Sequence, residues 1–110
     1  MRSRPAPLPR TVRTASLLLG LVVAFSTNAQ APPARLGLCA ACHGEHGIAT
    51  GKTIPNLAGQ NLEYLRQAVL QYQSGARDVP AMRAASAMLN AAELDQVLQW
   101  YAAQRPEAAP

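Results

Sequence analysis

Residues 36–47 read LGLCAACHGEHG and hold every cysteine and every histidine of this 110-residue chain. Cys39 and Cys42 are separated by two residues, and His43 follows directly. Two cysteines at this spacing can close a disulfide, ligate a metal ion or tether a cofactor. The remainder of the chain is needed to choose among these three kinds of site.

The first 29 residues have the organisation of a secretory signal peptide. Four arginines and no acidic residue precede an apolar run at residues 15–25, and the small residues Thr27 and Ala29 follow. Eleven apolar residues reach about 16 Å as a helix, against roughly 30 Å of hydrocarbon, so a cleaved signal is favoured over a retained membrane anchor. We expect cleavage after Ala29, which would leave residues 30–110 as one periplasmic domain with no stable membrane span.

The basic isoelectric point of about 9.7 belongs to this leader. Residues 30–110 carry six basic and six acidic side chains, so their formal net charge is zero. This balance gives no support for a nucleic-acid partner. A domain of this size with few aromatic side chains buries a limited surface, which favours stabilisation by a disulfide, a metal ion or a cofactor.

No stretch of residues 30–110 alternates with a period of two, and the apolar spacing predicts an all-α fold of three or four short helices. The predicted helices cover residues 35–41, 62–73 and 81–89, with a last one between Asn90 and Pro106. Residues 44–60 are rich in glycine and proline and predict an irregular loop. The apolar stripes expected to be buried are Leu62, Leu65, Val69 and Tyr72 in one helix and Leu94, Val97, Leu98 and Tyr101 in another.

Helix termini have recognisable signals. Asn61 is the expected N-cap of the second helix, and Gly75 is expected to end it. Asn90 is followed three residues later by Glu93, which predicts a capping box at the start of the last helix.

The segment CAACH is the C-x-x-C-H signature of covalent haem attachment. Two thiols add across the two vinyl groups of haem, and the adjacent His43 supplies an imidazole ligand to the iron. An exported protein could instead use Cys39 and Cys42 as a simple disulfide. A thioredoxin-like redox pair requires strands, and a structural zinc site requires four ligands rather than one tight cluster. The expected export and the small domain favour one covalently attached haem c.

The ligand on the opposite side of the iron is expected to be a methionine. His46 lies too close in sequence to the motif histidine to reach that side and is interpreted as a solvated loop residue. Met82 and Met88 lie six residues apart, so on a helix they point about 240° apart and only one of them can face the iron. Met82, which shares a helical face with Ala85 and Leu89, is the favoured ligand. Met88 is the alternative and is otherwise expected to pack.

The segments CAACHG, IPNLAGQ and YLRQAVLQYQSGAR, with a methionine before LNAAELDQVLQWYAAQ, resemble the class I c-type cytochromes. The resemblance is to the small bacterial soluble monohaem proteins and to the halves of dihaem ones, and it covers residues 35–105. It implies a cytochrome c fold around one haem. In that family the carbonyl of the matching proline, here Pro55, accepts a hydrogen bond from the ligating histidine. The position of the family's axial methionine corresponds to Met82.

The same resemblance implies that the last helix packs across the first through an aromatic pair, here Trp100 and Tyr101. Gly37 is then placed to permit a close crossing. Only nine residues separate Ala29 from Cys39, so the first helix is expected to be shorter than is usual in the family.

Iron held by His43 and Met82 has no open position for a substrate. The expected protein is therefore an electron carrier rather than an enzyme, and it exchanges single electrons with redox partner proteins. Those partners would be an upstream reductase or dehydrogenase and a downstream oxidase or reductase. Two alternatives remain, namely a haem-containing subunit of a periplasmic oxidoreductase and a haem module that senses a ligand.

Overall fold

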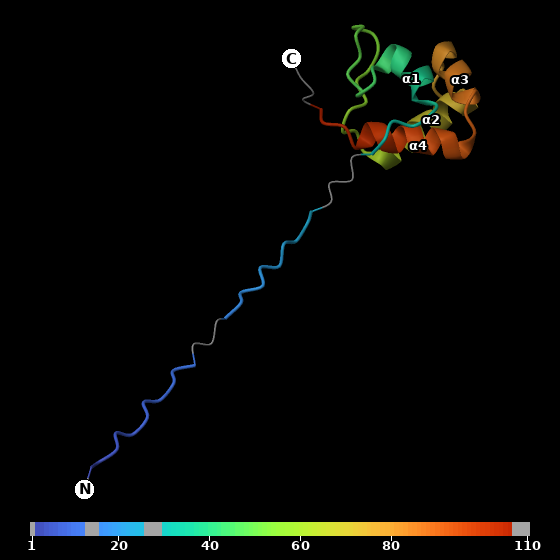
Figure 1. The fold of residues 1–110 in the computed structure, drawn as a ribbon. Coiled ribbons are helices and arrows are strands. Elements are labelled where there is room, and N and C mark those ends of the chain that lie inside the picture. The colour runs from blue at the N-terminus through green and yellow to red at the C-terminus, as the bar shows by residue number, and fades with distance from the viewer. Residues whose placement is uncertain (1, 13–15, 26–29, 107–110) are drawn as a thin grey trace.

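The computed structural model describes residues 2–12, 16–25 and 30–106. The expected cleavage site after Ala29 lies outside the described residues. Residues 2–12 and 16–25 form no helix or strand and extend away from the helical body (Figure 1). No helix in the described ranges is long and apolar enough to cross a membrane.

The described residues form four helices and no strand, which confirms the all-α prediction. The helices are α1 (Leu36–His43), α2 (Leu62–Ser74), α3 (Pro80–Ala87) and α4 (Ala91–Ala102). Helix α1 begins one residue later than predicted and extends through the whole C-x-x-C-H motif. Helix α4 ends at Ala102, before Pro106. Near this end, the carbonyl of Tyr101 accepts hydrogen bonds from the backbone N–H groups of Gly59 and Gln104.

The capping signals predicted for α2 and α4 are confirmed. The Asn61 side chain accepts a hydrogen bond of 3.0 Å from the Tyr64 backbone N–H, and Gly75 ends α2 in the left-handed conformation. At α4 the Asn90 side chain accepts from the Glu93 N–H at 2.8 Å, and the Glu93 carboxylate accepts from the Asn90 N–H at 3.1 Å. These local contacts mark both ends of α2 and the start of α4.

The core lies where α4 meets α1 and α2. The buried cluster comprises Leu36, Leu65, Val69, Val97, Leu98, Trp100 and Tyr101. The predicted stripes therefore face the core, although Leu62, Tyr72 and Leu94 are only half-buried.

The expected role of Gly37 is wrong. A Cβ atom at Gly37 would meet no other atom within 4 Å, so no close helix crossing takes place there. Because α1 starts at Leu36, Gly37 lies in its first turn and is exposed, while Leu36 makes the contact with the core.

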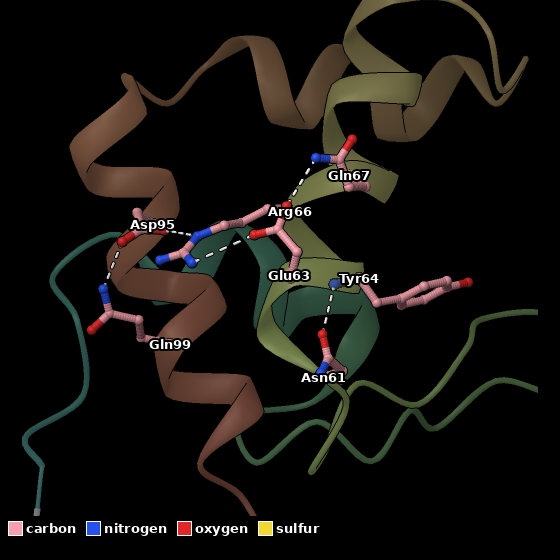
Figure 2. Close-up of polar contacts among 7 residues, drawn as sticks. All are labelled: Asn61, Glu63, Tyr64, Arg66, Gln67, Asp95 and Gln99. Carbon is pink, nitrogen blue, oxygen red and sulfur yellow. Dashed lines mark hydrogen bonds and ion pairs between the residues drawn. The ribbon is translucent and has the colours of Figure 1, made fainter.

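A polar contact on the surface joins α2 to α4 (Figure 2). Arg66 Nε donates to Asp95 Oδ1 at 2.6 Å, and Glu63 lies 3.8 Å from the same guanidinium. Gln99 donates to the other carboxylate oxygen of Asp95 at 2.6 Å. These two donors, Arg66 first, hold the pKa of Asp95 below its ordinary value.

Candidate functional site

The four helices and the loop after α1 surround one cavity of about 480 Å³. This volume is typical of cofactor sites, which are usually apolar with a few polar groups. Most of the lining is apolar, with contributions from Leu65 and Val69 of α2 and from Val97 and Leu98 of α4. The helices that form the core thus also form the walls of the site.

The motif residues Cys39, Cys42 and His43 line this cavity from α1. Side chains three and four positions apart lie on the same face of a helix, so the spacing of the motif directs all three to one side. The two thiols are not joined to each other; Cys39 is half-buried and Cys42 is exposed. Burial raises the pKa of the Cys39 thiol.

His43 is buried, and its Nδ1 atom lies 2.9 Å from the carbonyl oxygen of Pro55. A carbonyl oxygen can only accept, so Nδ1 carries a proton, and in the neutral imidazole Nε2 then keeps its lone pair. A neutral imidazole with a fixed tautomer is the form that ligates a metal ion. The structure thus places Pro55 against His43, as the family resemblance implied for these residues.

The loop between α1 and α2 folds back so that Pro55 reaches His43. Gly47 has a φ of +78°, and a Cβ there would collide with the Ala58 backbone nitrogen. The Gly47 carbonyl accepts from Leu57 N at 2.8 Å and from Ala58 N at 3.1 Å. A glycine at this position therefore permits the close approach of the two ends of the loop.

The two methionines occupy different environments. Met82 is half-buried on α3 and lines the cavity, whereas Met88 is 60% exposed and does not. The expected packing of Met88 is wrong, because its side chain is exposed at the C-cap of α3, whereas the next residue, Leu89, is buried. His46 is exposed outside the cavity, and its Nδ1 atom lies 3.1 Å from Gln104 Oε1.

Two contacts near the motif were not predicted from the sequence. Trp100 Nε1 donates to the Glu45 carbonyl at 2.6 Å, and the Tyr101 hydroxyl donates to the Gly44 carbonyl at 2.9 Å. They fix the loop immediately after His43 to the end of α4. The signal was present in the sequence, because buried tryptophan and tyrosine side chains require a partner for their polar atom.

The donor set suits a haem rather than a structural metal ion. Among the described residues, no three His, Cys, Asp or Glu side chains are grouped to hold a metal ion. The cavity instead combines apolar walls with two thiols, an imidazole that has a free Nε2, and a thioether. These are the groups needed to bind haem covalently and to ligate its iron.

No family model matches the chain, but comparison with known proteins also supports a haem protein. The thiosulfate dehydrogenase electron acceptor of Thiomonas intermedia is 30% identical over 105 residues, which is 94% of this chain and 48% of that protein. Cytochrome c4 of Pseudomonas aeruginosa is 32% identical over 78 residues, 71% of this chain and 39% of that protein. Cytochrome c-554(548) of Halomonas halodenitrificans is 38% identical over 50 residues, 46% of this chain and 60% of that protein.

These relatives support a c-type cytochrome. The four-helix structure is consistent with a cytochrome c fold. The cofactor of a c-type cytochrome is covalently attached haem c, and the motif Cys39-x-x-Cys42-His43 fits that attachment. The chain spans 39% to 60% of the length of the relatives it matches.

Proposed function

We propose that this protein is an exported one-electron carrier with a single haem c, a monohaem cytochrome of class I. Cys39 and Cys42 form the thioether bonds, and His43 and Met82 are the axial ligands. The observation that carries the proposal is that α1 and α3 bring these four side chains to one apolar cavity. The contrasting exposure of Met88 supports Met82 as the sulfur ligand.

The protein's own residues prepare the site for this role. The Pro55 carbonyl orients the His43 ring and increases its basicity, so Nε2 is ready to ligate iron. The thioether of Met82 raises the reduction potential relative to a second nitrogen ligand. Bound haem supplies the couple between ferric and ferrous iron.

The proposed pair of iron ligands favours electron transfer over catalysis. With His43 and Met82 in place there is no open position for a substrate, and the cavity lining contains no acidic side chain for acid–base chemistry. Carriers of this kind meet their partners through small, transient interfaces. Redox proteins of the periplasm are therefore the proposed partners.

A more specific candidate role is that of acceptor for a dehydrogenase. The relative from Thiomonas intermedia is named as an electron acceptor of thiosulfate dehydrogenase, and its similarity extends over 94% of this chain. In this version the protein is reduced by a dehydrogenase and then oxidised by a second partner. Stable co-purification with a larger oxidoreductase would instead favour a permanent haem-containing subunit.

The direct test is to express the full chain with export and haem c maturation and to characterise the purified protein. We expect mass spectrometry to find one haem on the peptide that contains Cys39 and Cys42, and an N-terminus at Gln30. The spectrum should show a Met–iron band when oxidised and a c-type spectrum after dithionite. A matched Cys39→Ser/Cys42→Ser variant should lack the attached haem.

Two results would contradict the proposal. A secreted protein in which Cys39 and Cys42 form a cystine, without haem, would remove the electron-carrier function. Haem that binds carbon monoxide readily at neutral pH and lacks the Met–iron band would favour the ligand-sensing alternative.

A further inference from the structure

Helix α3 is short and carries the proposed iron ligand Met82. It has eight residues, no side-chain hydrogen bond caps its N-terminus at Val79, and its last turn holds no basic residue. Of its residues only Ser86 is buried. A helix of this length is marginal on its own, because two turns scarcely offset the cost of helix nucleation. Its place beside the cavity therefore depends on contacts with other elements.

Two hydrogen bonds from distant parts of the chain end on the C-terminal turn of α3. Gln73, near the end of α2, donates from Nε2 to the Ser86 carbonyl at 3.3 Å. Arg35, the residue before α1, donates from Nη2 to the Met88 carbonyl at 3.1 Å. The last carbonyls of a helix have no partner within the helix, and a cation there also complements the helix dipole. These two donors therefore hold the C-terminal end of α3.

The Arg35 contact connects the two helices that carry the proposed iron ligands. Arg35 is the N-cap residue of α1, whose last residue is His43. Met88 is the C-cap residue of α3, on which Met82 lies. Within residues 30–106, no other hydrogen bond joins α1 or its N-cap to α3 or its C-cap. Arg35 is therefore a direct link between the two ligand-bearing helices.

We propose that Arg35 and Gln73 are positioning residues for the Met82 ligand, and that they limit how often Met82 leaves the iron. This inference rests on the proposed ligation of the iron by Met82. When the end of α3 separates from Arg35 and Gln73, the helix can move as a local unit and withdraw the thioether from the cavity. An external ligand then has an open position on the iron. The two contacts thereby favour an electron carrier over a ligand-sensing module.

The size of the effect follows from the fraction of molecules in which Met82 is detached. An external ligand binds only those molecules, so its apparent dissociation constant equals the intrinsic constant divided by that fraction. Removing one hydrogen bond between partly exposed groups should raise the detached fraction about threefold, and the apparent dissociation constant should fall by the same factor. Global unfolding contributes little, because only a very small share of a folded domain is unfolded under native conditions.

The test uses the haem-loaded protein, imidazole as the external ligand, and the variants Arg35→Ala and Gln73→Leu. Loss of the Met–iron band of the oxidised protein measures imidazole binding. We expect each variant to bind imidazole about threefold more tightly than the parent does. Arg35→Lys keeps a charged donor and should recover most of the parent dissociation constant. The Arg35 and Gln73 side chains are exposed, so the variants should accumulate with haem.

Two matched controls remove the same kinds of side chain from other places. Arg105→Ala removes an exposed arginine beyond α4. Gln67→Leu removes a glutamine of α2 whose side chain donates to Glu63 on the same helix (Figure 2). We expect both controls to bind imidazole as the parent does.

Hydrogen exchange of the backbone amides gives a readout that does not depend on ligand binding. In Arg35→Ala and Gln73→Leu we expect the amides of α3 to exchange faster, while those of α1 and α4 keep the parent rates. A merely structural role would instead lower the protection of all the helices together and leave the affinity for imidazole unchanged.

The proposal is overturned for either residue if its variant binds imidazole no more tightly than its control, or if α3 exchanges no faster relative to α1 and α4. Failure of the proposed function would look different, because the parent itself would then lack haem c or the Met–iron band. Retention of that band in Met82→Ala would likewise reject Met82 as the ligand before the contacts of α3 are tested.

Discussion

The Nδ1 atom of His43 lies 2.9 Å from the carbonyl oxygen of Pro55, twelve positions further along the chain. The imidazole belongs to α1, whereas the carbonyl belongs to the irregular loop that follows it. The strength of the proposed iron ligand therefore depends on how that loop is held, and Gly47 is the point at which the loop closes on itself.

Pro55→Gly is expected to raise the reduction potential. The more flexible backbone should loosen the carbonyl contact, which makes the His43 imidazole less basic and the ferric state less stable. We expect a shift of up to about tenfold in the ratio of the two redox states at a fixed potential, or ~59 mV. Potentiometric titration measures it, with Pro32→Gly, an exposed proline outside the cavity, as the control. A lower potential in Pro55→Gly would contradict the assigned hydrogen bond.

The two methionines give a sharper test of the ligand set. Met82→Ala should lower the potential, abolish the Met–iron band and open the iron to carbon monoxide, because a thioether ligand is lost from the cavity. Met88→Ala should do none of these, since the Met88 side chain is 60% exposed. Absorption spectra of the oxidised proteins and of the reduced proteins under carbon monoxide measure the difference. The reverse pattern would exchange the two assignments.

Much of the helical frame was predictable because it depends on local interactions. Asn61, Gly75 and the Asn90–Glu93 pair act within one or two turns of the chain, and their capping bonds are present in the structure. The spacing of the apolar residues likewise predicted which faces of α2 and α4 are buried. The C-x-x-C-H motif is also local. Its spacing places Cys39, Cys42 and His43 on one face of a helix and indicates a haem, so a cavity beside these residues could be expected from the sequence.

Contacts between distant segments were not predictable in the same way. Gly37 was expected at a helix crossing, but its environment depends on where α1 begins, and that start leaves it exposed. Trp100 and Tyr101 were assigned to helix packing, whereas they also donate hydrogen bonds to the loop after His43. Arg77 is the last residue of the segment YLRQAVLQYQSGAR, but its position at the cavity depends on the turn at Gly75.

The capping box of α4 should contribute measurably to stability. Asn90→Ala removes the side-chain acceptor for the Glu93 N–H and is expected to cost about 1 kcal/mol of unfolding free energy. Asn90→Ser keeps a capping oxygen and should recover most of that loss. Chemical denaturation of the oxidised haem protein measures both variants. Equal stability of the alanine and serine variants would show that the cap does not limit stability.

The contact of Asp95 with Arg66 should make stability depend on pH in the acid range. Because the folded-state pKa of Asp95 lies below its unfolded value of about 3.9, its contribution is complete above that pH and is lost as the pH falls through the folded-state pKa. Asp95→Asn should therefore lower the denaturation midpoint slightly at pH 7, and the difference from the parent should disappear in strong acid. The effect is small because both side chains are partly exposed.

The matched control for this prediction is Glu63→Gln. The Glu63 carboxylate lies 3.8 Å from Arg66 and is more exposed than that of Asp95, so its removal should change the midpoint less at pH 7. Measuring both variants against the parent at each pH separates the contact from acid effects that are common to all three proteins. A difference between parent and Asp95→Asn that stayed constant from pH 7 into strong acid would show that Asp95 does not stabilise the fold through its charge.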